Sequence, residues 1–257
     1  MIVLECKALS KNYGDFCLQK INLELHGGKI VGLIGENGAG KTTLINLILD
    51  KINRDSGEVY ICGQKYDRTN IKLKNHIGVI LDECHLPYDF TVKNIDLCFK
   101  NIYNKWSSQL FYEYIDKFNI PYNLKIGSFS RGMKKKLELA IILAYDADII
   151  LLDEFTSGLD IVFRQYVSDL LKRIVKEKNK IVIVSTHNMD DIEDFVDTII
   201  FIKRGKIQCL VSKDDIINKY LTGECDNRNL VLREVTLKDI IFMHIKGSNI
   251  ENERSRN

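Results

Sequence analysis

Prolines, net charge and long apolar runs are scarce in this sequence, and each scarcity limits what the chain can be. Only 2 prolines occur among 257 residues, so no proline-rich linker divides the chain. Lys and Arg total 37 against 35 Asp and Glu, a net charge of +2, which gives no global electrostatic argument for nucleic acid or an anionic membrane surface. No apolar run approaches the ~18 residues that span a bilayer. If the protein serves a membrane, we expect it to do so through a partner.

Cysteine is present, but without any paired spacing. The chain has 7 cysteines and no C-x-x-C pair, which argues against a metal site or a disulfide framework and predicts a reducing compartment. The start, MIVLECK, lacks a basic region ahead of an apolar one, so we expect no signal peptide. The length fits one large or two small domains with ample apolar content for a core.

The stretch from residue 35 to residue 43 has the spacing G-x-x-x-x-G-K-[ST] of a phosphate-binding loop. An apolar run precedes it and a helix-compatible run follows, which is the context that the motif requires. Its glycines let backbone N–H groups turn towards phosphate oxygens, and the dipole of the following helix favours the same anion. The predicted nucleotide-binding residues are Gly35, Glu36, Asn37, Gly38, Ala39, Gly40, Lys41, Thr42 and Thr43. We expect Lys41 to reach the β- and γ-phosphates and Thr42 to ligate Mg²⁺; the full match disfavours a glycine-rich turn without a ligand.

Two further apolar runs, 148–152 and 180–185, are typical of buried parallel strands, and polar side chains follow each. Because ligands of open α/β sheets bind at the carboxyl ends of the strands, Asp153, Glu154 and His187 should face the phosphate-binding loop. We expect Asp153 to bind Mg²⁺, Glu154 to take a proton from an attacking water and His187 to bond the γ-phosphate. The alternatives are an acid pair that caps a helix and a structural histidine.

The region around the phosphate-binding loop has strand-like patterns. Residues 2–8 and 17–25 alternate as half-buried strands do, and the turn between them carries Tyr13. Tyr13 either stacks on a base or packs on its neighbours, and both interpretations stay open. Turns are expected at 55–58 and 62–65, with a short strand between them.

From residue 91 to residue 145 the pattern is helical. Ser130 is the expected cap of a long helix over 134–144. Three lysines, Lys134 to Lys136, are expected to form a solvated face of that helix. Aromatic residues are concentrated here: Phe99, Tyr103, Trp106, Phe111, Tyr112, Tyr114 and Phe118. We interpret them as the core of a helical subdomain, with a partner-docking face as the less favoured alternative.

Five motifs in order, GENGAGKTT, FSRGM, IILLDE, SGLD and STH, resemble the nucleotide-binding subunit of ABC transporters over about residues 2–220. One such motif is weak evidence, whereas five in sequence are specific. The stretch GVILDECHLP at 78–87 is similar to the bacterial subgroup whose permeases are of the ABC-2 export type. The resemblance implies an α/β fold, namely a P-loop NTPase (RecA-like) core with an N-terminal antiparallel β subdomain and an inserted α-helical subdomain.

The same resemblance implies domain limits and cofactors. Residues 1–223 would form the ATP-binding domain, with the helical subdomain at about 84–145 and a partly helical or disordered tail at 224–257. ATP and Mg²⁺ would be the cofactors. The ligands of the metal would be Thr42 and Asp153, with Asp82 acting through water.

The resemblance also assigns roles to other residues. Tyr13 would stack on adenine, Glu154 would be the catalytic carboxylate, and His187 would sense the γ-phosphate. A signature motif, which in this family completes the site of the opposite subunit, would comprise Ser130, Arg131, Gly132 and Met133. Asp160 would couple the two nucleotide sites of the dimer, and Asp82 would be a second coupling residue.

Three positions depart from the family pattern. Asp82 stands where Gln is usual and adds negative charge near the γ-phosphate. Arg131 stands in the usual S-G-G-Q motif and adds bulk and charge while it keeps a backbone N–H. Phe155 replaces the Pro that usually follows the catalytic Glu; we expect it to leave the turn freer and to alter the rate of hydrolysis.

The motifs predict an ATPase subunit that powers a separate integral membrane permease, in the direction of export, through ATP-driven closure of a dimer. The second ATP-binding subunit would be identical to this chain or different from it, giving a homodimer or a heterodimer. No nucleic acid is expected as a partner. The protein would act at the cytoplasmic face of the cell membrane. The alternative is a soluble ATP switch of the same family that acts on a ribosomal, DNA or regulatory partner.

Overall fold

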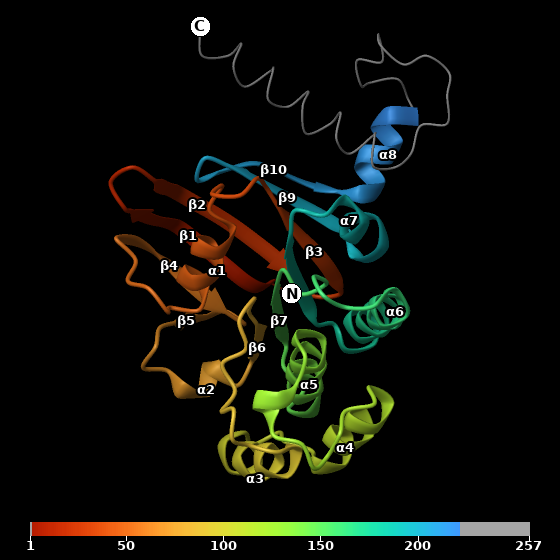
Figure 1. The fold of residues 1–257 in the computed structure, drawn as a ribbon. Coiled ribbons are helices and arrows are strands. Elements are labelled where there is room, and N and C mark those ends of the chain that lie inside the picture. Colours follow the sequence, from red (N-terminus) through yellow and green to blue (C-terminus); the bar gives the residue numbers. More distant parts are fainter. Residues whose placement is uncertain (1, 222–257) are drawn as a thin grey trace, which may run out of the picture.

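The computed structural model describes residues 2–221, whose strands form two sheets (Figure 1). Four strands form an antiparallel sheet in the order β2-β1-β4-β5, and six form a second sheet in the order β10-β9-β3-β8-β7-β6. The strands are β1 (Ile2–Asn12), β2 (Cys17–His26), β3 (Lys29–Ile34), β4 (Ser56–Ile61), β5 (Gln64–Tyr66), β6 (Ile77–Ile80), β7 (Ile149–Asp153), β8 (Ile181–Thr186), β9 (Thr198–Lys203) and β10 (Lys206–Ser212). In the second sheet β6, β7, β8, β3 and β9 run parallel, and β10 returns antiparallel to β9.

Helices cover the parallel sheet and extend the molecule at one end. They are α1 (Lys41–Ile48), α2 (Ile71–Lys74), α3 (Val92–Ile102), α4 (Ser108–Lys117), α5 (Arg131–Ala144), α6 (Ile161–Lys178), α7 (Met189–Phe195) and α8 (Lys213–Leu221), with a 3₁₀ turn at Ile126–Ser128. Figure 1 shows α3 and α4 together at the end of the molecule opposite α8. Within residues 2–221, no helix is long and apolar enough to cross a membrane.

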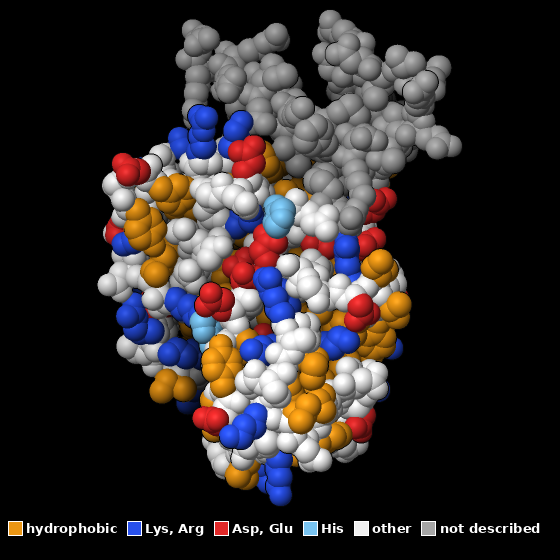
Figure 2. All heavy atoms as spheres, viewed as in Figure 1, with side chains coloured by type: hydrophobic (Ala, Val, Ile, Leu, Met, Phe, Trp, Pro, Cys, Tyr) orange, Lys and Arg blue, Asp and Glu red, His pale blue; other side chains and the backbone are white. Residues whose placement is uncertain are grey.

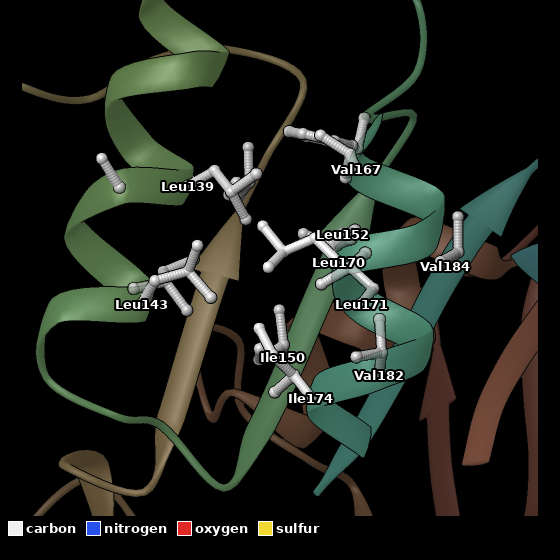
Figure 3. Packing of buried hydrophobic residues seen from close by; sticks show 14 of the residues in the cluster. Leu139, Leu143, Ile150, Leu152, Val167, Leu170, Leu171, Ile174, Val182 and Val184 are labelled. Carbon is white, nitrogen blue, oxygen red and sulfur yellow. The ribbon is translucent and has the colours of Figure 1, made fainter. Parts of the chain in front are cut away.

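The core lies on both faces of the parallel sheet. Figure 3 shows Ile150 and Leu152 of β7 directed at side chains of α5 and α6, among them Leu139 and Leu170. The alternate residue Leu151 packs on the opposite face, in the cluster that includes α1 and the antiparallel sheet. Because successive side chains of a strand point to opposite faces, a strand covered on both faces is an unbroken apolar run. The predicted buried strand is therefore confirmed.

The helical region from α3 to α5 has an aromatic core. Phe111 and Phe118 are fully buried, and the ring centroids of Trp106 and Phe111 lie 5.0 Å apart. Tyr103 stacks on Tyr145 with centroids 4.1 Å apart. Offset and tilted ring pairs at such distances stabilise a core beyond the area they bury. The interpretation of the aromatics as a helical core is therefore confirmed.

Several local predictions need correction or lie outside the described residues. The turn expected at 62–65 runs into a short strand, β5, and α2 was not expected. Lys135 is not solvated: it is 2% exposed, whereas its neighbours Lys134 and Lys136 are half-buried. The tail at 224–257 lies outside the described residues.

Candidate nucleotide site

The register of the parallel sheet brings three strand ends to one edge. Ile34 of β3 pairs with Thr186 of β8, and Ser185 pairs with Asp153 of β7. The residues that follow each strand are therefore neighbours, although they are up to 152 positions apart between Gly35 and His187. Figure 2 shows acidic side chains gathered near the middle of the visible face, directly below a histidine.

The phosphate-binding loop connects β3 to α1, as predicted. Gly40 precedes α1 with φ +110, a conformation that favours glycine, and an added Cβ would lie 2.8 Å from the Phe16 ring. Gly38 has φ +78, and an added Cβ there would meet no atom within 4 Å. No side chain caps the N-terminus of α1 at Gly40. The first-turn N–H groups of a helix have no partner within it, so this open, uncapped end suits an anion.

Lys41 is held over the loop from inside the protein. Its Nζ donates to the carbonyl of Gly35 at 2.6 Å and to that of Glu36 at 3.3 Å, and the side chain is buried. Burial lowers the pKa of Lys41, and the carboxylates of Asp153 and Glu154 partly oppose this shift. The loop carbonyls fix the ammonium beside the anion site, and in the described part of the chain no side-chain counter-ion is bonded to it.

The side chains expected at a metal site lie together. The Thr42 hydroxyl contacts Oδ2 of Asp153 at 3.3 Å. The other oxygen of that carboxylate, Oδ1, is buried and has no hydrogen-bond partner among residues 2–221. Among the described residues no group of three or more His, Cys, Asp or Glu side chains could hold a metal alone. One hydroxyl and one carboxylate with an unused oxygen fit Mg²⁺, which takes few protein ligands and completes its shell with phosphate and water.

Glu154 and His187 meet across the ends of β7 and β8. Glu154 Oε1 lies 2.9 Å from His187 Nδ1. The Glu154 side chain is 24% exposed and that of His187 is 61% exposed, so both can reach a ligand. Glu154 has φ +47, in the left-handed region that a non-glycine residue seldom adopts. The structure therefore brings together the two residues that were predicted to act on the γ-phosphate.

A buried aspartate that the sequence did not reveal supports this pair. Asp191, in α7, is 0% exposed. Its Oδ2 accepts from the hydroxyl of Thr156 at 2.7 Å and from that of Thr186 at 2.5 Å, and its Oδ1 lies 3.0 Å from the Arg164 guanidinium. Asp191 thus ties the segment after Glu154 to the strand end before His187. Its position four residues after His187 is the one signal that could have suggested it.

The predicted signature residues lie at the start of α5. Ser130 caps this helix, and its Oγ accepts from the Met133 N–H at 3.2 Å, as predicted. Gly132 packs so closely on the turn after β7 that an added Cβ would lie 3.0 Å from the Gly158 carbonyl. Asp160 caps α6 by accepting from the Phe163 N–H at 2.8 Å.

Two of the departures from the family pattern prove to be partners. The Arg131 guanidinium forms an ion pair with the Asp82 carboxylate. Both side chains are about half exposed. Within the described residues, Arg131 is the hydrogen-bond partner of Asp82, and no hydrogen bond joins Asp82 to Thr42 or Asp153. The two added charges therefore neutralise each other.

Phe155 requires a correction. Its side chain is 1% exposed and belongs to the main hydrophobic cluster. A fully buried aromatic ring anchors the chain at this point, so the expectation of a freer turn is wrong. Tyr13, in contrast, lies at the turn between β1 and β2, 53% exposed, with Lys11 Nζ 5.5 Å from its ring centroid.

These features define the class of the protein. A parallel sheet with a glycine loop before α1, a lysine and threonine at the start of that helix, and carboxylates at the end of β7 is a P-loop nucleoside triphosphatase. A protein-family model described as ABC transporter matches residues 18–157. The chain therefore belongs to the ATP-binding proteins of the ABC transporter family, and it is an ATPase.

Similar proteins agree with this assignment. The chain is 30% identical over 242 residues to the ABC transporter ATP-binding protein YtrB of Bacillus subtilis, a match that covers 90% of this chain and 80% of YtrB. It is 28% identical over 233 residues to the bacitracin transport ATP-binding protein BcrA of Bacillus licheniformis, covering 88% of this chain and 76% of BcrA.

Solved structures share the fold. An ATP binding subunit of an ABC transporter superposes with a TM-score of 0.79 at 22% identity, covering 93% of this chain and 98% of the other. A dimeric ATP-binding cassette in a post-hydrolysis state, bound to ADP and Pi, superposes with a TM-score of 0.71 at 26% identity, covering 81% of this chain and 98% of the other.

Proposed function

We propose that this chain is the ATP-hydrolysing subunit of an exporter whose membrane-spanning permease is a separate protein. The observation that carries the proposal is the contact of Glu154 with His187, beside the loop that holds Lys41 and next to the Thr42–Asp153 pair. This arrangement supplies a phosphate cradle, a metal position and a carboxylate base at one sheet edge.

Each group of residues has a defined task in this proposal. The loop from Gly35 to Thr43 binds the phosphates of ATP, and Tyr13 lies at an exposed turn where it can stack on adenine. Thr42 and Asp153 hold Mg²⁺, which would neutralise charge on the phosphates. Glu154 accepts a proton from the attacking water, while His187 orients Glu154 and contacts the γ-phosphate.

The proposal includes a dimer of ATP-binding subunits, alike or unlike. The start of α5, with Ser130 to Met133, presents a helix N-terminus that would meet the γ-phosphate bound by the opposite subunit. Asp160 lies on the neighbouring turn and would couple the two sites. The dimeric cassette with ADP and Pi, to which this chain is similar, supports this assembly.

A groove beside the helical region suits a permease. A cavity of about 260 Å³ opens between β6, α3 and α5, and most of its lining is apolar, including Val79, Leu81, Phe99 and Ile142. An apolar groove rimmed by polar groups is typical of a protein interaction site. The similarity to a protein named for Nod factor export supports the direction of export. The protein would then lie at the cytoplasmic face of the membrane.

The test uses the tagged Glu154→Gln variant in the full chain, purified with ATP from solubilised membranes. This change removes the base but keeps the amide near His187, so we expect it to hold the ATP-bound dimer closed. Mass spectrometry should find a polytopic membrane protein in near-equal amount. The matched control is Glu177→Gln, an exposed glutamate on α6. Recovery of ribosomal or DNA-bound partners alone would contradict the transporter function and favour a soluble ATP switch.

A further inference from the structure

One lysine of the consecutive three at the start of α5 differs from the others in its surroundings. Lys134 Nζ lies 4.7 Å from the centroid of the Tyr88 ring, and Lys136 Nζ lies 4.2 Å from that of Phe163. Lys135, in contrast, is 2% exposed, and its Nζ donates to two backbone carbonyls, that of Glu154 at 2.6 Å and that of Ser157 at 2.9 Å. It therefore bridges α5 to the turn that begins with Glu154.

We propose that Lys135 is a positioning residue for hydrolysis, because it holds the backbone of the turn at residues 154–160 and thereby sets where the Glu154 carboxylate lies. This inference rests on the proposed role of Glu154 as the base. Within the described residues, Lys135 bonds the main-chain carbonyl of Glu154 and not its carboxylate, so it acts through the backbone of the residue that carries the base.

The conformation of the turn explains why such a clamp is needed. Glu154 has φ +47, which costs a non-glycine residue of order 1 kcal/mol and persists only where the surroundings fix it. A bond to the carbonyl of the same residue fixes the peptide plane that follows it. A second bond, three residues further at Ser157, sets the width of the turn. The two bonds together restrain the direction in which the Glu154 side chain leaves the backbone.

Other contacts show that the turn and the start of α5 form one packed unit. Gly132 approaches the Gly158 carbonyl so closely that an added Cβ would lie 3.0 Å from it. Lys136 contacts Asp160 at 3.4 Å. The two hydrogen bonds of Lys135 are shorter than the Lys136–Asp160 contact. A displacement of α5 would therefore reach residue 154 mainly through Lys135. In the proposed dimer, the same helix N-terminus meets the opposite nucleotide, so closure and placement of the base would be linked.

The electrostatics argue against a purely stabilising role. Lys135 donates to carbonyls and makes no ion pair within the described residues, and burial lowers its pKa against the opposing influence of Asp82, Glu138 and Glu154. Burying an ammonium without a bonded counter-ion is costly for folding. However, an ammonium carries three donors on one atom and can bond two carbonyls at once, which no apolar side chain can do.

The experiment compares Lys135→Met with wild type, with Lys134→Met as the matched control on the same helical turn. We expect Lys135→Met to lower kcat about 10- to 100-fold, since a misplaced reacting group costs up to about 10²-fold. The Kd for ATP, measured by calorimetry in the Glu154→Gln background, should change less than about 2-fold. Lys135→Arg, which keeps donors for both carbonyls, should recover part of the kcat. Lys134→Met should leave kcat near that of wild type.

A double-mutant cycle separates this positioning role from a general contribution of Lys135 to the stability of the fold. If Lys135 acts through the Glu154 carboxylate, Lys135→Met added to Glu154→Gln should lower the residual single-turnover rate less than about 2-fold. An equal loss in both backgrounds, a parallel weakening of ATP binding, or no recovery by Lys135→Arg would overturn the inference. If Glu154→Gln itself retained the wild-type rate, the proposed function of Glu154 would fail instead. A wild-type kcat in Lys135→Met beside an inactive Glu154→Gln would reject the positioning role alone.

Discussion

The phosphate-binding loop and the turn at residues 154–160 serve the same site but are built in opposite ways. The loop is contiguous in sequence, and the groups that we propose as its ligands are backbone N–H groups whose directions follow from glycine conformations and from the start of α1. The turn takes its shape from side chains on distant elements, chiefly Lys135 of α5 and Asp191 of α7. A backbone-built site can be transferred as a motif, whereas a site assembled from several elements depends on how they pack.

The departures from the family pattern are distributed in accordance with this difference. The loop matches its motif at every defined position. Arg131, Phe155 and Asp82, in contrast, all lie in or beside the turn at residues 154–160 and the start of α5, which together we call the assembled region. There, one change is compensated by another: the charges of Arg131 and Asp82 pair, and the Phe155 ring is buried where proline would have restricted φ. The assembled region can vary in sequence because a change at one residue can be compensated by a change at the residue that it contacts.

The largest effect is expected in the loop. In Lys41→Ala the ammonium that the carbonyls of Gly35 and Glu36 hold beside the proposed phosphate site is lost. We expect kcat/KM for ATP to fall about 10³-fold, comparable to the loss of one preorganised charge-stabilising group. Steady-state phosphate release measures this. Lys29→Ala, at the exposed start of β3, is the control; a fall below 10-fold in Lys41→Ala would contradict the assignment.

The second largest effect concerns stability, in the assembled region. Phe155→Ala removes a fully buried ring from the main cluster, so we expect the free energy of unfolding to fall by about 3 kcal/mol. Phe155→Leu keeps most of the volume and should cost about 1 kcal/mol. Urea unfolding of the nucleotide-free protein measures both. Equal stabilities of the two variants would show that the ring does not anchor the turn.

Sequence reasoning succeeded where the chemistry is local. The loop, the strand ends at Asp153 and His187, and the Ser130 cap follow from motif spacing and from the rule that ligands bind at the carboxyl ends of parallel strands. The contact of Glu154 with His187 could be expected as proximity but not as a hydrogen bond, because it depends on the unusual φ of Glu154.

The rest depended on tertiary packing. Lys135 was assigned to a solvated face because three adjacent lysines are usually exposed, yet it stands four residues before Leu139 and seven before Ile142, both buried. That helical spacing was an available signal that one lysine faces inward. Asp191 gave no comparable signal, because its three partners come from separate segments. Phe155 was misjudged because its burial is a property of the packed helices and not of the turn.

A pH effect of intermediate size is expected from Glu138, a half-buried residue of α5. Burial raises the pKa of Glu138 from 4.5 to about 7 in the folded protein. The folded state therefore binds more protons than the unfolded state between these values, so Glu138 costs stability increasingly as pH rises from 4.5 to 7. We expect Glu138→Gln to be more stable than wild type by about 2 kcal/mol above pH 7.5, and the difference to vanish near pH 4. Urea unfolding across pH measures this; the control is Glu177→Gln. A pH-independent difference would contradict the raised pKa.

The smallest effect is expected for the ion pair of Arg131 with Asp82. Its measurement tests whether the pair stabilises the fold or only cancels the two added charges. Both side chains are about half exposed, so solvent screens their attraction. A double-mutant cycle of Asp82→Ala and Arg131→Ala, measured by urea unfolding, should give a coupling of at most about 1 kcal/mol that falls further in 1 M salt. Each single variant should differ from wild type more in its rate of ATP hydrolysis than in its free energy of unfolding, since each leaves one uncompensated charge beside the start of α5. A salt-insensitive coupling above about 2 kcal/mol would mean that the pair is part of the packed unit around Lys135 and that the assembled region is more rigid than its exposed edge suggests.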